Sequence, residues 1–251
     1  MFAHRGGAKL APENTMPAFD TGMACGADGL ELDVHLAADL VPVVIHDATL
    51  DRTTDRTGPV AALTSDELAR VDAGYRFARD GSHPFRGTGA GVPTLEAVLR
   101  RFAGARVIIE MKGASATLAR AVVAMVRRLG AVDRVCLSSF AQVTVDTVRA
   151  EAPEIATSAS QDEARRTLHR SWIRWPWAGQ RPYAAFQVPE RVGRMRVVSP
   201  AFVRQAHREG QVVQVWVVDT PGDISRLLAW GVDGLITDRP DVAVEVVKGH
   251  R

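Results

Sequence analysis

The segment HRGGAKLAPENTMPAFDTGMACGADGLELDVHLAADLVPVVIHD, residues 4–47, contains the first strand–helix–strand pattern of the chain. Residues 2–5 predict a short strand, because an apolar start is followed by a pair of glycines. Residues 15–25 place apolar side chains on one face of a helix, and residues 29–35 and 41–46 predict two further strands. The last of these is apolar on both faces, which is typical of a strand covered on both sides. The segment therefore favours an α/β fold.

The alternation of strands and helices continues to the end of the chain, which favours parallel strands with helical crossovers. Eight strands in about 250 residues favour a (β/α)8 TIM barrel, so we expect one barrel domain over residues 1–251. The third strand departs from the alternation, because residues 35–40 are too few for a crossover helix. Residues 50–91 are glycine-rich and are expected to form a long insertion after this strand. We expect further strands at 106–112, 134–138, 155–158, 184–188 and 212–218, helices at 65–71, 94–102, 115–129, 142–150, 162–168 and 200–209, a last full helix at 221–230, and a return to the barrel at 231–240.

Composition and charge argue against several classes of protein. With 46% hydrophobic and 24% charged residues, the chain resembles an ordinary globular protein. Its net charge of +2 is too small to argue for nucleic acid as a partner. No apolar run approaches the roughly 18 residues that span a membrane, and no signal-peptide pattern is present, so we expect a cytoplasmic protein. Cys25 and Cys136 lack metal-ligand spacing and are expected to be buried thiols.

Charged side chains occur where the predicted strands end, and functional residues of a (β/α)8 barrel come from these carboxyl ends. Glu31 and Asp33 are spaced i, i+2, as are Glu110 and Lys112, so each pair points to one face of its strand. A structural ion pair is the simpler interpretation of the second pair, but it is unusual at the end of an otherwise apolar strand. Together, the strand ends carry His4, Arg5, Glu31, Asp33, His46, Glu110 and Lys112.

These residue types suit phosphate chemistry with a metal ion. Glu31, Asp33 and Glu110 offer three hard oxygen ligands, which suit one divalent ion, Mg²⁺ or Ca²⁺. Arg5 offers a bidentate fork for phosphate oxygens, and Lys112 offers a point charge. The metal would stabilise charge on the phosphoryl oxygens.

Displacing an alkoxide from phosphorus requires an acid for the leaving group and a base for the nucleophile. Histidine titrates near neutrality, so His4 and His46 are candidates for the two roles. A single histidine at a strand end is more often structural. Two histidines with three carboxylates and two cations are not easily explained in that way.

The motifs HRGG, PENT, the E-x-D of ELDV, HD followed by L-x-RTT, and the E-x-K of IIEMK resemble the glycerophosphodiester phosphodiesterase family. The resemblance covers nearly the whole chain, through LSSF, QVP, VWVVD and GVDGLITDRP. It implies a (β/α)8 barrel that uses a divalent metal to hydrolyse glycerophosphodiesters to sn-glycerol 3-phosphate and an alcohol. The matching positions imply that His4 and His46 are the acid/base pair. They also imply that Glu31, Asp33 and Glu110 are the metal ligands, and that Arg5 and Lys112 contact the phosphate.

The resemblance also implies residues that bind the substrate. Glu13 and Asn14 belong to the PENT motif, which lines the site in the family. Trp216 is retained and is expected to contact the glycerol or the alcohol group. Residues 50–91 match a family insertion that helps to form the substrate pocket.

The chain departs from the family at two positions. Leu40 occupies a turn where glycine is common, which we interpret as a changed turn without catalytic consequence. Val217 replaces a usual threonine, so no role of that threonine is carried over.

Several alternatives stay open at this point. A lysophospholipase D-like enzyme would use the same chemistry with a wider, greasier pocket formed by residues 50–91 and 170–183. The stretch WIRWPWAGQRPY, residues 172–183, favours either a loop packed on the barrel flank or a lip that contacts lipid-like substrates or a membrane surface. A non-catalytic binding module would have lost some of the seven residues, and enolisation or aldol chemistry does not explain both histidines and both cations. Oligomeric state, and attack by the glycerol 2-hydroxyl or by water, are left open.

Overall fold

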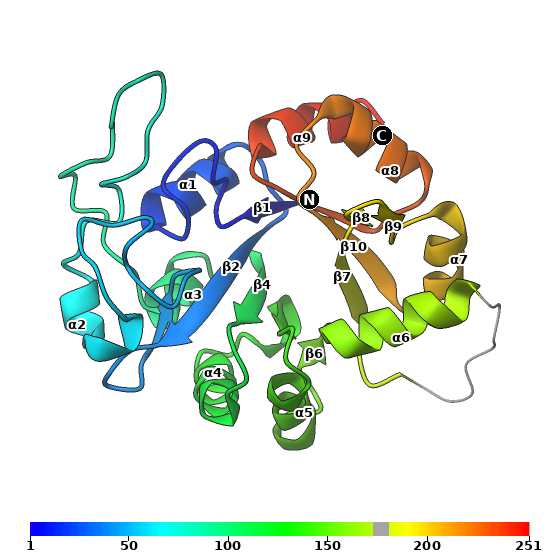
Figure 1. Ribbon diagram of the computed structural model, residues 1–251, viewed down its shortest axis with the longest axis horizontal. Helices are drawn as coiled ribbons and strands as arrows, with labels where there is room; N and C mark the ends of the chain where they lie inside the picture. Colours follow the sequence, from blue (N-terminus) through cyan, green and yellow to red (C-terminus); the bar gives the residue numbers. More distant parts are fainter. Residues whose placement is uncertain (173–180, 251) are drawn as a thin grey trace.

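Eight parallel strands form the barrel at the centre of the computed structural model, which describes residues 1–172 and 181–250 (Figure 1). Neighbouring strands follow the order β6-β5-β4-β2-β1-β11-β10-β7, and a parallel bridge between Ser158 and Ala185 connects the two ends. The predicted (β/α)8 fold class is therefore confirmed. The barrel strands are β1 (Phe2–His4), β2 (Gly29–Leu36), β4 (Arg106–Met111), β5 (Val135–Ser138), β6 (Ala156–Thr157), β7 (Ala185–Pro189), β10 (Val212–Trp216) and β11 (Gly234–Thr237).

Helices surround the strands and connect most of them to the next parallel strand (Figure 1). The first helix begins where the Thr15 hydroxyl accepts a hydrogen bond from the backbone N–H of Ala18, as expected of an N-cap. The expectation that residues 221–230 form the last full helix is wrong, because α9 follows the final strand. The surrounding helices are α1 (Met16–Ala24), α3 (Leu95–Arg101), α4 (Ala116–Arg128), α5 (Gln142–Glu151), α6 (Gln161–Trp172), α7 (Pro200–Arg208), α8 (Pro221–Ala229) and α9 (Pro240–Lys248).

The third predicted strand is not a barrel strand. β3 (Pro42–Val44) pairs antiparallel with the end of β2, with Val34 opposite Val44 and Leu36 opposite Pro42. The short connection permits only a hairpin, and β11 supplies the eighth barrel strand. The strand is nevertheless buried on both faces, because Val43 packs against the insertion and Val44 packs in the main core of the barrel.

The insertion builds a small apolar core of its own beside the barrel (Figure 1, left). Val43 of β3 packs in this core with Leu50, Val60 and Leu68 of the insertion. It contains the short helices η1 (Val60–Ala62) and α2 (Ser65–Leu68). Because β3 and the insertion both follow β2, they lie at the end of the barrel where functional residues are expected.

Two further short features connect the barrel strands. The helix η2 (Val132–Arg134) precedes β5, and a hairpin of β8 (Arg191–Val192) and β9 (Met195–Arg196) follows the carboxyl end of β7. Among the described residues, no helix is both long and apolar enough to cross a membrane. Residues 173–180 of the tryptophan-rich stretch lie outside the described residues.

Candidate active site

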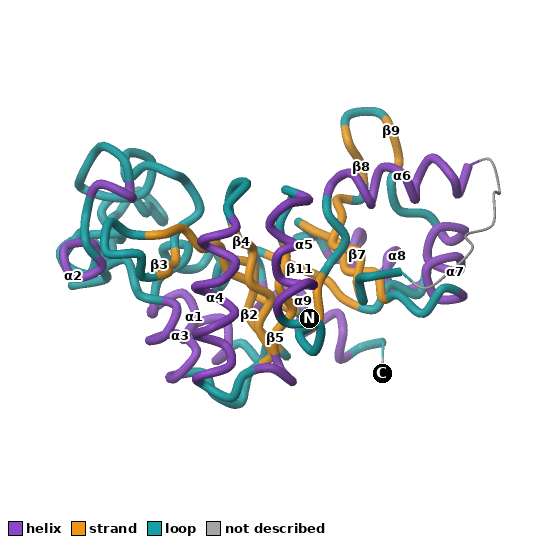
Figure 2. The backbone as a smooth tube through the Cα atoms, turned by 90° about the horizontal axis from the view of Figure 1, so that it is seen from below, coloured by secondary structure: helices purple, strands orange, loops and turns teal. Residues whose placement is uncertain are grey.

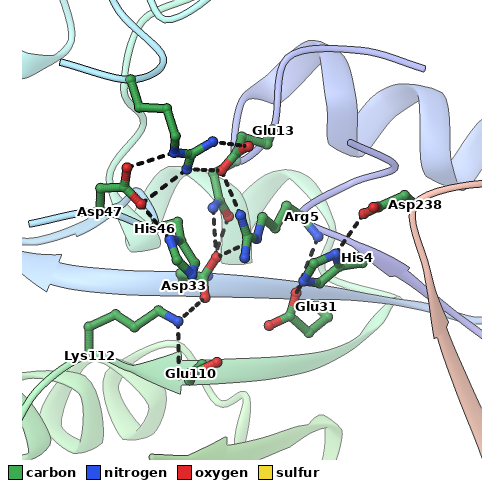
Figure 3. Close-up of polar contacts among 12 residues, drawn as sticks. His4, Arg5, Glu13, Glu31, Asp33, His46, Asp47, Glu110, Lys112 and Asp238 are labelled. Carbon is green, nitrogen blue, oxygen red and sulfur yellow. Dashed lines mark hydrogen bonds and ion pairs between the residues drawn. The ribbon is translucent and has the colours of Figure 1, made fainter. Parts of the chain in front are cut away.

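The strand register brings the predicted site residues together at one end of the barrel (Figure 3). His4 of β1 lies opposite Glu31 of β2, and Asp33 of β2 lies opposite Glu110 of β4. The backbone N–H of Ile45 donates to the Asp33 carbonyl oxygen at 3.0 Å, which holds the segment after β3 against the same strand. The antiparallel hairpin thus places His46 at the site, although β3 is not part of the barrel.

The loop after β1 requires glycine, because it runs close to α1. Gly6 has a φ of +88°, and a Cβ there would lie 2.5 Å from the backbone carbon of Ala18. This close approach turns the chain so that the backbone N–H of Arg5 donates to Glu31 Oε2 at 3.2 Å. The HRGG motif therefore places a main-chain donor, as well as two side chains, at the carboxylates.

Three carboxylates converge inside this end of the barrel. Oxygens of Glu31, Asp33 and Glu110 lie within 4.8 Å of one another, and Glu31 and Asp33 are buried. Lys112 Nζ lies 2.8 Å from Asp33 Oδ1 and 2.8 Å from Glu110 Oε1. Arg5 Nε adds a second positive charge, 3.1 Å from Asp33 Oδ2.

The three carboxyl groups differ in the direction of their pKa shifts, because Lys112 and Arg5 lie closest to Asp33. Burial, together with the nearby charge of Asp33, raises the pKa of Glu31 to about 8. Burial also raises the pKa of Glu110. Burial alone would raise the pKa of Asp33, but Lys112 and Arg5 reverse the effect and lower it.

This cluster could hold a metal ion, as its donor chemistry shows. All three groups offer carboxylate oxygens, which are the ligands that hard divalent ions prefer. Within the described part of the chain, the Glu31 carboxylate accepts a hydrogen bond from the backbone N–H of Arg5, and its ion-pair partner is the His4 ring, whose Nε2 lies 3.8 Å away. Glu31 is therefore the carboxylate that most lacks a compensating positive charge.

The His4 ring is fixed by a carboxylate, Asp238, that was not among the predicted site residues. His4 Nδ1 lies 2.6 Å from Asp238 Oδ1, beyond the end of β11. Asp238 is fixed in turn, because its backbone N–H donates to Asp219 Oδ1 at 2.8 Å, while Lys9 Nζ pairs with Asp219 Oδ2 at 2.8 Å. Burial alone would lower the pKa of His4, but Glu31 and Asp238 raise it overall.

The His46 ring has an equivalent partner within its own motif. His46 Nδ1 lies 2.6 Å from Asp47 Oδ1, and Arg52 Nε donates to Asp47 Oδ2 at 2.6 Å. The other guanidinium nitrogens of Arg52 donate to both oxygens of Glu13 at 2.7 Å. The hydrogen bond from Arg52 holds the pKa of Asp47 far below its usual value. Asp47 and Arg52 were missed as site residues, although the HD and L-x-RTT motifs contain them.

The PENT residues hold other site residues in place (Figure 3). Glu13 Oε1 accepts from Arg5 Nη1 at 2.8 Å. Asn14 is buried, its Nδ2 donates to Asp33 Oδ2 at 2.9 Å, and its Oδ1 accepts from the Asp33 backbone N–H at 3.3 Å. Hydrogen bonds from the loop before α1 thus hold the side chains of Arg5 and Asp33 in position.

A cavity of about 170 Å³ opens at this end of the barrel, beside the carboxylates of Glu31 and Glu110, and has two unlike sides. One side is ionisable and the other carries no charge. The Trp216 ring on the uncharged side meets the Phe140 ring edge-on, with 6.2 Å between their centroids. The ionisable side consists of His4, Arg5, Glu31, His46, Glu110 and Lys112, and the uncharged side includes Ser138, Ser139, Phe140, Ser158, Ala159, Gln187, Trp216 and Val217.

A (β/α)8 barrel with ionisable side chains converging on a cavity at the carboxyl ends of its strands is the architecture of an enzyme. Residues 4–242 match the glycerophosphoryl diester phosphodiesterase family, and the chain belongs to that family.

Individual relatives agree with this assignment over nearly their whole length. A glycerophosphodiester phosphodiesterase of Caldanaerobacter subterraneus subsp. tengcongensis is 30% identical, over 99% of this chain and 97% of the relative. One of Bacillus altitudinis is 32% identical, over 98% and 97%. The crystal structure of glycerophosphodiester phosphodiesterase from Agrobacterium tumefaciens strain C58 superposes with a TM-score of 0.79 at 33% identity, covering 97% of this chain and 98% of that one.

Proposed function

We propose that the chain, as one domain over residues 1–251, hydrolyses glycerophosphodiesters to sn-glycerol 3-phosphate and an alcohol. The observation that carries this proposal is one cavity lined by two imidazoles, two cations and the carboxylates of Glu31 and Glu110. The buried Asp33 carboxylate lies within 4.8 Å of both carboxylates. Family membership supports the substrate class, since the relatives described above are named for this activity.

Glu31, Asp33 and Glu110 are proposed to hold one divalent ion, Mg²⁺ or Ca²⁺. When bound, the ion would withdraw electron density from the phosphoryl oxygens and neutralise their charge. Arg5 and Lys112 line the same cavity and are proposed to orient the phosphate. Both cations already pair with Asp33, so a bound phosphate would share them with that carboxylate.

His4 and His46 are proposed to carry the proton transfers. Asp238 and Asp47 occupy Nδ1 of the two rings at 2.6 Å, which leaves Nε2 of each ring for exchange with the substrate. One ring would protonate the leaving alkoxide while the other removes a proton from the attacking nucleophile, which is water or the glycerol 2-hydroxyl. Attack by the hydroxyl would give a cyclic phosphate that water then opens to glycerol 3-phosphate.

The uncharged side of the cavity is proposed to receive the glycerol or the alcohol group. Trp216 offers an aromatic surface there, and Ser138, Ser139 and Gln187 offer polar groups for hydroxyls. Glu13 and Asn14 support substrate binding through Arg5 and Asp33. The insertion at residues 50–91 is proposed to influence the substrate choice, since it supplies Arg52 to this network.

The test is hydrolysis of a panel that contains glycerophosphocholine, glycerophosphoethanolamine and glycerophosphoglycerol, with detection of glycerol 3-phosphate. We expect release of this product, and we expect His4→Ala and His46→Ala to lose about 100-fold or more of turnover. A panel without any released glycerol 3-phosphate would contradict the substrate class. Near-normal turnover of either variant would refute the role of that histidine.

A second candidate, a lysophospholipase D-like activity, is favoured by the apolar mouth of the cavity. Phe140 and Val217 line the cavity and are also exposed, at 49% and 40% of their surfaces. Rates on glycerophosphocholine and on lysophosphatidylcholine, measured below the aggregation threshold of the lysolipid, distinguish the two. A higher specificity constant for the lysolipid would establish this alternative.

A further inference from the structure

The hairpin of β8 and β9 is an exposed basic and apolar projection beside the active-site mouth. Its pairing places Arg191 opposite Arg196 and Val192 opposite Met195, and all residues from 191 to 196 are exposed. It follows β7, whose Gln187 lines the cavity, and it extends beyond the barrel in Figure 2. The hairpin therefore lies at the same end of the barrel as the site.

The arginines of the hairpin carry positive charge without compensation. Like charges directly opposite each other on paired strands are destabilising. The neighbouring carboxylate, Glu190, is already paired with Arg226 at 2.5 Å, and Arg196 lies over the Trp230 ring at 5.2 Å. Within residues 1–172 and 181–250, neither Arg191 nor Arg194 forms an ion pair. Such an arrangement is better satisfied by an anionic partner outside the chain.

Apolar side chains are exposed at this same end of the barrel. Among the described residues, seven large hydrophobic side chains are exposed, and five of them follow the carboxyl ends of β5, β7 and β10. Isolated exposed hydrophobic residues need no explanation, but a group around an active-site mouth indicates a binding surface. The five are Phe140, Val143, Val192, Met195 and Val217.

We propose that hairpin 191–196 docks the catalytic end of the barrel onto an anionic phospholipid surface. The arginines would contact lipid phosphates, while Val192 and Met195 at the tip would enter the boundary between headgroups and acyl chains. A nucleic acid or a soluble polyanion would satisfy the arginines but leave the two apolar side chains in water. The mixed character of the tip therefore favours a lipid surface.

This docking does not depend on the proposed reaction, because binding to vesicles is measured without turnover. It would bring the cavity mouth close to substrates that arise from, or remain in, a lipid layer. The exposed Phe140 and Val217 would then face the same layer as the hairpin tip.

The test measures co-sedimentation of the full chain with phosphatidylcholine vesicles and with vesicles that also contain phosphatidylglycerol. We expect salt-sensitive binding to the anionic vesicles, weakened about 10-fold or more in the double variant Arg191→Gln/Arg194→Gln. The matched control is Arg204→Gln/Arg208→Gln on α7, which removes the same charge from two exposed arginines outside the hairpin. This control should bind like the unmodified chain.

A second variant, Val192→Ser/Met195→Ser, keeps the charge and removes the apolar tip. It should weaken vesicle binding while thermal unfolding shows that the fold is retained. Equal loss in the hairpin and control variants, equal binding to neutral vesicles, or an unchanged affinity of the serine variant would each overturn the proposal. Hairpin-dependent binding to single-stranded DNA without binding to vesicles would also overturn it.

Discussion

The replacement Glu31→Gln should stabilise the metal-free protein while removing a ligand of the proposed metal. Burial and the Asp33 charge raise the pKa of Glu31 from 4.5 to about 8. The folded protein therefore holds a proton on Glu31 that the unfolded chain releases at neutral pH. Glutamine has a similar shape, remains neutral in both states, and retains an oxygen that can accept from the Arg5 backbone N–H.

The size of the effect follows from proton linkage. Between the two pKa values the folded state binds more protons than the unfolded state, so stability falls as the pH rises from 4.5 to 8. At pH 7 the protonation of Glu31 on folding lowers the free energy of unfolding by about 3 kcal/mol. This value follows because pH 7 lies between the two pKa values, and each pH unit above the unfolded pKa costs about 1.4 kcal/mol. For a chain of this size, the melting temperature of the variant should rise by roughly 6 to 12 °C.

The neighbouring replacement Asp33→Asn is a matched control of opposite sign. Lys112, Arg5 and Asn14 all stabilise the ionised form of Asp33, and they lower its pKa although burial opposes this. Removing that charge leaves the partly buried cations of Lys112 and Arg5 without full charge compensation. The free energy of unfolding of the variant should therefore fall by about 3 kcal/mol.

The assay is chemical unfolding in the presence of a chelator, from pH 5 to pH 8. The stability of the unmodified chain should fall over this range relative to that of Glu31→Gln, and the difference should increase with pH. Destabilisation by Glu31→Gln at pH 7, or the same sign of effect in both variants, would refute the assignment of the uncompensated charge to Glu31.

Two further predictions concern residues that support the site, and a third concerns the turn between β2 and β3. Asp238→Asn should reduce turnover by about 10-fold or more and change the pH profile, because Asp238 fixes the His4 ring; an unchanged profile would exclude this role. Arg52→Gln should reduce turnover through His46 by about 10-fold, since it frees both Asp47 and Glu13; Arg52→Lys should recover only part of it, and full activity of Arg52→Gln would contradict the network. Leu40→Gly should raise the free energy of unfolding by up to about 1 kcal/mol without changing turnover, because Leu40 has a φ of +61°; a loss of stability would show that the turn is not strained.

The sequence predicted the barrel and most of the convergent side chains, because both depend on local patterns. Spacing of i, i+2 places Glu31 with Asp33 and Glu110 with Lys112 on common strand faces, and the parallel register then brings the pairs together. The same reasoning failed for Val43 and its neighbours, since an apolar run does not reveal whether helices or an insertion cover it. The only sequence feature that indicated the antiparallel direction of β3 was the short connection between it and β2.

The residues that fix the two histidines could not be predicted in the same way. Asp238 meets His4 across 234 positions of sequence, and this contact depends on the final strand lying beside the first. Arg52 reaches Glu13 over 39 positions, through a loop whose path no periodicity describes. The family motifs include the segments that contain Asp238 and Arg52. The hydrogen-bond partners of these two residues depend on the closed barrel and on the packing of the insertion.

The most direct test of the proposed metal-dependent reaction is the release of glycerol 3-phosphate from glycerophosphocholine by chelator-stripped protein as metal is returned. The proposal predicts negligible release after chelation and saturable recovery with Mg²⁺ or Ca²⁺ at one ion per chain. Glu110→Gln should require a higher metal concentration for the same recovery. Full turnover in excess chelator, with no response to either ion, would contradict the assignment of the carboxylate cluster.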